Sequence, residues 1–182
     1  MSTLKKASVC SVCIALCCVL PIAFHAVSLG GAFSPMHIPV LLCGLVCGWP
    51  YGAFCGIAGP ILSSLVAGMP GSAMLLYMVP ELLVYGLTAG LLMKLIHTKN
   101  TCADLYLSLA GAMLLGRVAG GIVRAVFYTG GQPYSIALWA SAYFVQSVPG
   151  IILHLAVIPL LVLVLTKAKL IPARYGTKAA AR

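Results

Sequence analysis

Three formally charged side chains, Glu81, Arg117 and Arg124, fall within long apolar stretches of the sequence. A charged side chain in the hydrocarbon core of a bilayer costs several kcal/mol unless it is paired or hydrated, so each of them marks a site. Arg117 and Arg124 are seven residues apart and share one face of a helix. Glu81 can pair with either arginine and lock two helices together, or these groups can line a ligand cavity. The sequence leaves both interpretations open.

Polar and aromatic side chains are expected beside these charges, in the outer half of the membrane. The candidates for ligand contact, in addition to Glu81, Arg117 and Arg124, are His37, Tyr85, Trp139, Tyr143 and Gln146. Each has an alternative role: Trp139 in an interfacial aromatic belt, Gln146 in a hydrogen bond between helices and His37 at a helix cap. We expect the cavity to lie among residues 31–37, the turn at 68–71 and the fourth to sixth helices.

Catalytic chemistry is not expected, because the chain has only two carboxylates, Glu81 and Asp104, and no catalytic motif. It also lacks a nucleotide-binding motif, so active transport would need an external ATPase, and we expect no cofactor bound by this chain. Eight cysteines fall inside or at the ends of apolar helices, where a thiol behaves as a small hydrophobic group. No metal site is therefore predicted.

The composition indicates that lipid surrounds the elements that must position these residues. Hydrophobic residues make up 62% of the 182 residues and charged residues only 7%, too few to cover a water-facing surface. The net charge of +9 does not indicate nucleic-acid binding, because the lysines and arginines follow a membrane-topology pattern.

Apolar runs near the length of a membrane span predict one all-α domain over residues 1–182. We expect six transmembrane helices, with approximate ranges 7–29, 36–48, 52–68, 72–96, 103–128 and 136–166. Gly48-Trp49-Pro50-Tyr51-Gly52 predicts a tight turn that splits 36–68 into two short helices. The residues 167–182 are expected to form a loose, basic cytoplasmic tail.

The positions of the cations predict that both termini face the cytoplasm. Lysines and arginines outside the helices precede the first, separate the fourth from the fifth, or follow the sixth. The connections on the opposite side, near 30–35, 69–71 and 129–135, contain none. An excess of lysine and arginine in cytoplasmic loops is the established topology rule, so we expect a multi-pass protein of the bacterial plasma membrane.

An ordered set of short segments resembles the substrate-binding S components of energy-coupling factor (ECF) vitamin transporters. The segments are Ser34-Pro35-Met36-His37-Ile38-Pro39-Val40-Leu41-Leu42-Cys43-Gly44, Gly48-Trp49-Pro50-Tyr51-Gly52, Pro60-Ile61-Leu62-Ser63-Ser64-Leu65, Gly68-Met69-Pro70, Pro80-Glu81-Leu82, Tyr85-Gly86-Leu87, Gly116-Arg117-Val118 and Val148-Pro149-Gly150-Ile151-Ile152-Leu153. The resemblance implies six helices, a ligand pocket on the outer side, and partners: an ECF transmembrane coupling protein and two ATP-binding-cassette ATPases.

Members of this family often dock through small residues on the first helix. Here Ala7, Ser11 and Ala15 recur every four residues, a pattern that allows another helix to approach closely. The resemblance makes this face the candidate for partner docking, and ordinary packing within the chain is the alternative.

The segments look most similar to those of family members that take up small heterocyclic vitamin precursors. The resemblance therefore implies a substrate such as dimethylbenzimidazole or niacin. Glu81 or Gln146 could accept a hydrogen bond from a ring N–H, and a free arginine would suit a carboxylate. A Glu81–Arg117 pair would favour an uncharged base. The alternative function is a self-sufficient secondary carrier or channel, although a carrier usually shows internal repeats and none is found.

Overall fold

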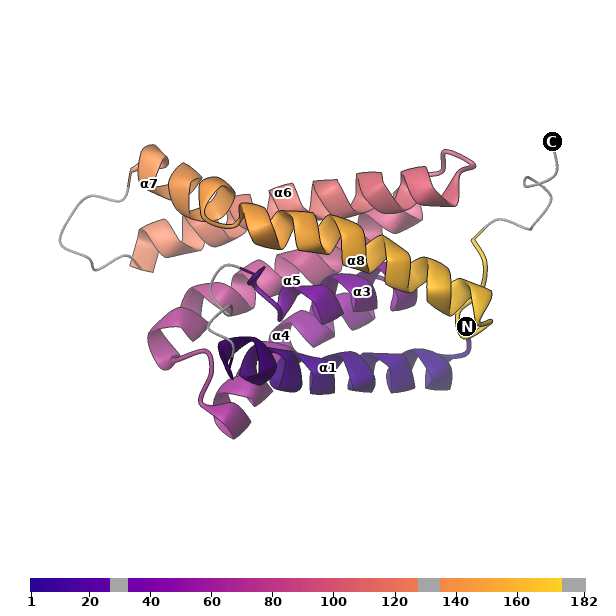
Figure 1. The fold of residues 1–182 in the computed structure, drawn as a ribbon, viewed down its shortest axis with the longest axis horizontal. Coiled ribbons are helices and arrows are strands. Elements are labelled where there is room, and N and C mark those ends of the chain that lie inside the picture. Colours follow the sequence, from indigo (N-terminus) through magenta and orange to yellow (C-terminus); the bar gives the residue numbers. More distant parts are fainter. Residues whose placement is uncertain (27–32, 128–134, 175–182) are drawn as a thin grey trace.

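The structure is a computed structural model that describes residues 1–26, 33–127 and 135–174, all of its regular elements being helical (Figure 1). The elements are α1 (Thr3–Ala26), α3 (His37–Cys47), α4 (Trp49–Ala67), α5 (Ser72–Leu95), α6 (Thr101–Phe127), α7 (Ile136–Ala140), the π-helical η1 (Ser141–Val145) and α8 (Val148–Lys167). Within the described ranges no strand is present, which confirms the predicted all-α class.

Five of these helices, α1, α4, α5, α6 and α8, are long and apolar enough to cross a membrane. The sixth predicted span is not one helix: its first part forms α7 and η1, and a turn at Gln146 and Ser147 separates them from α8. Residues 27–29 and 128 of the predicted spans, and residues 30–32 and 129–134 of the predicted outer connections, lie outside the described residues.

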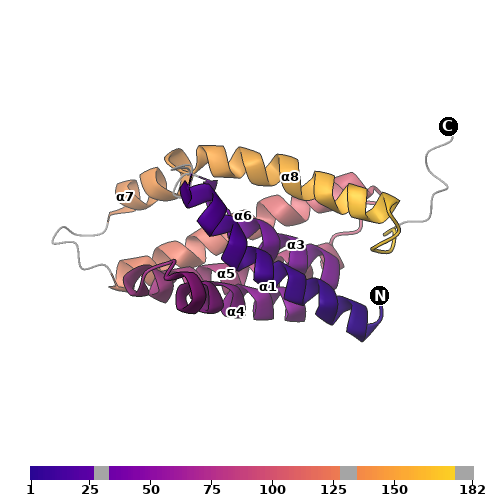
Figure 2. The same ribbon diagram turned by 60° about the horizontal axis from the view of Figure 1, so that its bottom comes forward.

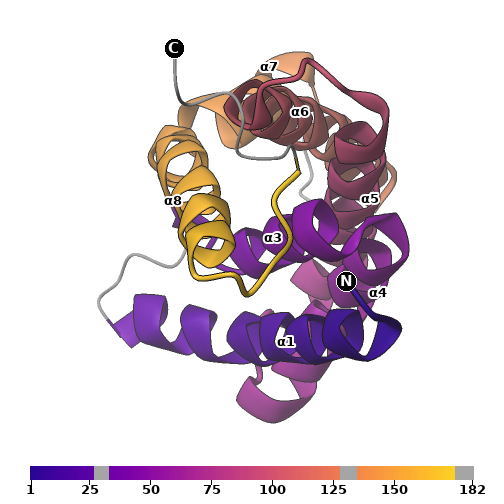
Figure 3. The same cartoon turned by 90° about the vertical axis from the view of Figure 1, so that its right-hand side faces the viewer.

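The short helix α3 lies at the centre of the bundle, between α1, α5 and α8 (Figure 3). Its 11 residues span roughly 16 Å, and all but one of them are buried. A helix that is apolar all round is stable only inside a larger structure. The predicted turn after it is present at Gly48, whose φ of 95° favours glycine, but α4 begins at Trp49 rather than at residue 52.

Glycines allow α3, α4 and α5 to pack almost backbone to backbone. A Cβ atom on Gly86 of α5 would overlap the carbonyl oxygen of Gly52 in α4, and one on Gly44 of α3 would overlap the carbonyl oxygen of Gly86. Helices in lipid associate through such close contacts, since no hydrophobic effect drives them together there. This packing fixes the position of α3, and with it the first residue of α3, His37.

The basic residues of distant segments gather at one end of the bundle, here called the basic end. It contains the start of α1, the 96–100 connection and the end of α8 (Figures 1 and 2). The α3–α4 turn lies there too, because the Cys47 thiol donates a hydrogen bond to the carbonyl oxygen of Lys6, with 3.7 Å between sulfur and oxygen.

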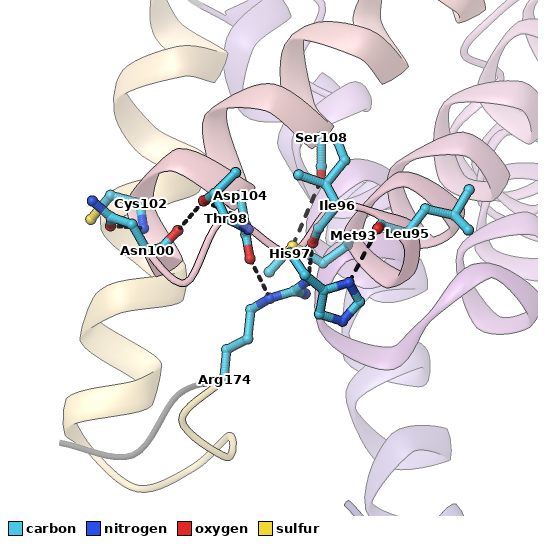
Figure 4. A network of polar contacts seen from close by, with 10 residues as sticks. All are labelled: Met93, Leu95, Ile96, His97, Thr98, Asn100, Cys102, Asp104, Ser108 and Arg174. Atoms are coloured by element: carbon cyan, nitrogen blue, oxygen red, sulfur yellow. Dashed lines mark hydrogen bonds and ion pairs between the residues drawn. The ribbon is translucent and has the colours of Figure 1, made fainter. Parts of the chain in front are cut away.

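Part of the predicted loose tail is ordered at this end. Arg174 reaches back to α6 and forms an ion pair with Asp104, with 2.6 Å between Nε and Oδ2, and it also donates to the carbonyl oxygen of Ile96 (Figure 4). Asp104 is fully buried and accepts further hydrogen bonds from Thr98. A buried carboxylate needs such partners, which accounts for the folded-back course of 168–174. Residues 175–182 lie outside the described part.

Replacing Gly86 by alanine tests the close helix packing. We expect Gly86→Ala to destabilise the protein by about 1–3 kcal/mol, because the added methyl group meets the backbone of α4. The control is Gly111→Ala, also inside a helix, whose new methyl group would meet only the end of the Leu92 side chain. Thermal unfolding in detergent measures both. Equal stability of the two variants would contradict the proposed packing.

Candidate functional site

A cavity of about 560 Å³ opens at the end of the bundle opposite the basic end. It lies between the end of α1, the segment 34–37, the turn at 69–71, α5, α6 and η1. All of these except the end of α1 belong to the segments expected from the sequence. The expected site residues that line it are His37, Glu81, Tyr85, Arg117, Arg124, Tyr143 and Gln146.

Glu81 is the only carboxylate that lines the cavity. It lies on α5, is 7% exposed, and meets residues of α3, η1 and α6. His37 Nε2 lies 3.6 Å from its Oε1, and the Tyr143 hydroxyl donates a hydrogen bond of 3.4 Å to its Oε2. Gly120 of α6 makes room for this carboxylate, since a Cβ atom there would lie 2.7 Å from Oε2. The side chain is thus held by contacts from three separate parts of the chain.

Arg117 is buried and lines the same cavity as Glu81, but it has different partners. Its Nη1 donates a 2.6 Å hydrogen bond to Ser147 Oγ, and its guanidinium lies 5.6 Å from the centre of the Phe144 ring. Ser147 in turn donates to the carbonyl oxygen of Tyr143. Of the two arginine pairs considered from the sequence, neither forms among the described residues, and the imidazole of His37 lies against the Glu81 carboxylate instead.

Arg124 lies two turns beyond Arg117 on α6 and also lines the cavity. Its guanidinium stands 5.3 Å from the centre of the Tyr77 ring and is only partly buried. The cavity therefore contains two guanidinium groups and one carboxylate, an excess of positive charge that an anionic group on a ligand would complement.

The apolar walls of the cavity are rich in methionine, which the sequence analysis did not single out. Four methionines line it: Met36, Met69, Met74 and Met78. Thioether side chains adapt in shape and contact aromatic rings favourably, so these walls suit a flat ring.

The turn that carries Met69 is fixed by two serines at the end of α4. Ser63 donates a 2.6 Å hydrogen bond to the carbonyl oxygen of Met69, and Ser64 donates one of 2.9 Å to that of Pro70. The adjacent Ser-Ser pair was the signal in the sequence that could have located this wall.

Trp139 is the one expected site residue that does not line the cavity. Its indole N–H donates a 3.2 Å hydrogen bond to the carbonyl oxygen of Arg117, and its ring lies over Gly121, where any Cβ atom would overlap it. It therefore packs against the backbone of α6, outside the cavity lining.

The π-helical segment η1 gives Tyr143 its position. The backbone N–H of Gln146 donates a 2.9 Å hydrogen bond to the carbonyl oxygen of Ser141, five residues earlier. Such π-turns are rare and frequently occur at functional sites. The sequence pattern predicted an uninterrupted helix here because a single wide turn leaves no mark on apolar periodicity.

His154 of α8 is another residue near the site that was not predicted from the sequence. Its side chain is 1% exposed and stacks on His37, with 5.9 Å between the ring centres. Neither of its ring nitrogens makes a hydrogen bond of normal geometry with a described residue. It forms the layer behind His37 rather than part of the cavity wall.

The three small residues of α1, Ala7, Ser11 and Ala15, are all exposed. A neighbouring face of α1 carries Cys10 and Cys17, which are buried against α3 and α4. No described residue of the chain therefore covers the face formed by Ala7, Ser11 and Ala15.

Comparison with known proteins now decides the family. The model of the family described as "ECF transporter, substrate-specific component" matches residues 5–162. The chain belongs to this family. No curated protein and no solved structure matches it significantly. The match confirms the resemblance seen in the sequence, and together with the five long apolar helices it makes this ECF component a multi-pass membrane protein.

Replacing Glu81 by glutamine tests how this carboxylate is held. We expect Glu81→Gln to change the free energy of unfolding by less than about 1.5 kcal/mol, because its partners are a histidine and a tyrosine hydroxyl that an amide can still engage. Thermal unfolding measures the change. A loss of about 3–5 kcal/mol would instead show that Glu81 neutralises a buried arginine.

Proposed function

We propose that this protein is the substrate-capturing S component of an ATP-driven ECF importer. In this proposal it binds a small vitamin or cofactor precursor from the outer side of a bacterial plasma membrane. The observation that carries the proposal is the cavity around Glu81, in which a buried carboxylate and two arginines face a space large enough for a small molecule. A site of this kind, mostly apolar with a few convergent polar groups, is typical of small-molecule binding.

The proposed topology has six crossings with both termini in the cytoplasm. It is supported by the gathering of basic residues at one end, the end that the rule for positive charges assigns to the cytoplasm. The short α3 serves as one crossing, running from Met36 at the cavity end to the α3–α4 turn at the basic end. The cavity then faces the outside.

The proposed substrate is a flat heterocyclic base such as dimethylbenzimidazole or niacin. The methionine and tyrosine walls suit the ring, and the Glu81 carboxylate can accept a hydrogen bond from a ring N–H. A Glu81–Arg117 pair would have favoured an uncharged base, but Glu81 does not pair with Arg117. The charge of the substrate is therefore not restricted by such a pair. The partly exposed Arg124 offers a carboxylate-bearing ring such as niacin a second contact.

Uptake by reconstituted protein tests the proposed function. We expect proteoliposomes that contain this chain alone to bind labelled dimethylbenzimidazole or nicotinate without accumulating it, because no nucleotide-binding motif supplies energy. Addition of an ECF coupling protein and its two ATPases should produce ATP-dependent accumulation. Accumulation by this chain alone, driven by an ion gradient, would contradict the proposal and support a secondary carrier.

The exposed face of Ala7, Ser11 and Ala15 is the proposed docking site for the coupling protein. Close approach of a partner helix requires small side chains, so Ala15→Leu should abolish co-purification with the coupling protein while leaving substrate binding unchanged. The control is Val12→Leu, exposed on the same helix but outside this face. Unchanged complex formation by Ala15→Leu would exclude this face as the docking site.

A further inference from the structure

A groove of about 830 Å³ lies at the basic end, between the first turns of α1 and the last turns of α8. Three lysines from opposite ends of the sequence line it, Lys5 from α1 and Lys167 and Lys169 from the end of α8. Leu163 and Ile171 add apolar surface to its walls.

The positive charge of this groove is not balanced from within. None of the residues that line it is acidic. The nearby carboxylate, Asp104, is fully buried and already paired with Arg174. Like charges held together in this way destabilise the free protein and attract an anion.

One wall of the groove is held in place by hydrogen bonds, by a buried side chain and by an ion pair. After α8, the backbone N–H groups of Leu170 and Ile171 donate hydrogen bonds to the carbonyl oxygen of Leu165, at 3.0 and 3.4 Å. Ile171 is 7% exposed, and the Arg174–Asp104 ion pair closes the turn (Figure 4). This strap, residues 168–174, places Lys169 over the groove in the left-handed backbone region, with φ of 56°.

We propose that this groove binds a phospholipid with an anionic headgroup. The ends of α1 and α8, two helices long enough to cross the membrane, place the groove at the level of the lipid phosphates whichever way the protein is inserted. Lysines near the membrane surface attract anionic lipid headgroups. The lysines therefore hold the phosphate, and the apolar residues contact the first part of an acyl chain. This lipid site is independent of the proposed transport function.

Native mass spectrometry of protein taken from nanodiscs tests the proposal, with phosphatidylglycerol and phosphatidylcholine in equal amounts. We expect phosphatidylglycerol to be retained preferentially. The triple variant Lys5→Gln, Lys167→Gln, Lys169→Gln should lose at least about tenfold of that retention. The control variant Lys94→Gln, Lys99→Gln removes exposed lysines at the same end but outside the groove, and should retain the lipid. Equal loss in both variants would overturn a defined site.

A second variant separates a built site from general charge attraction. Asp104→Asn makes the protein more positive, yet releases the strap, so we expect lower retention of phosphatidylglycerol. General attraction predicts unchanged or higher retention, and that result would overturn the proposal. Should Asp104→Asn fail to fold, Ile171→Ser loosens the strap without changing charge and carries the same expectation. Soluble glycerol phosphate is the last comparison, since binding as strong as that of the lipid would assign the groove to a free phosphate compound instead.

Discussion

Burial of charge inside a membrane protein is the constraint on which the cavity end of the bundle depends. A carboxylate in a medium of low dielectric constant is stable only with hydrogen bonds or opposite charge around it. The partners of Glu81, His37 and Tyr143, come from the start of α3 and from the π-turn of η1. Each of these elements departs from a regular membrane-spanning helix. The irregular parts of the fold therefore converge on the charged group that needs them.

The regular part of the fold makes this convergence possible. Glycines at the contacts of α3, α4 and α5 bring three backbones together, so a helix of 11 residues can be enclosed and can present His37 at a fixed depth. On α6, Gly116 lies against the ring of Tyr85 and Gly120 lies against Glu81. Small residues thus act at a distance from any ligand, by setting how closely the cavity walls approach one another.

The sequence was informative where the physics is local. Apolar length and glycine turns predicted the approximate bounds of α1, α3, α4, α5 and α6, and the rarity of intramembrane charge singled out Glu81, Arg117 and Arg124. It was uninformative about partners, because which of several groups meets Glu81 depends on the rotation and depth of separate helices. Three features therefore could not be predicted from the sequence. They are the contact of Glu81 with His37 instead of an arginine, the π-turn that positions Tyr143, and the place of Trp139 outside the cavity lining. The ion pair of Arg174 with Asp104 was missed for the same reason.

The structure of the protein purified together with its natural ligand tests the central claim most directly. The account predicts density for one small, flat molecule in the cavity at the end opposite the lysines, with a polar atom within hydrogen-bond distance of Glu81 or Tyr143 and its ring against the methionine wall. A flat substrate molecule bound outside this cavity, or one in the cavity that contacts neither Glu81 nor Tyr143, would contradict the account.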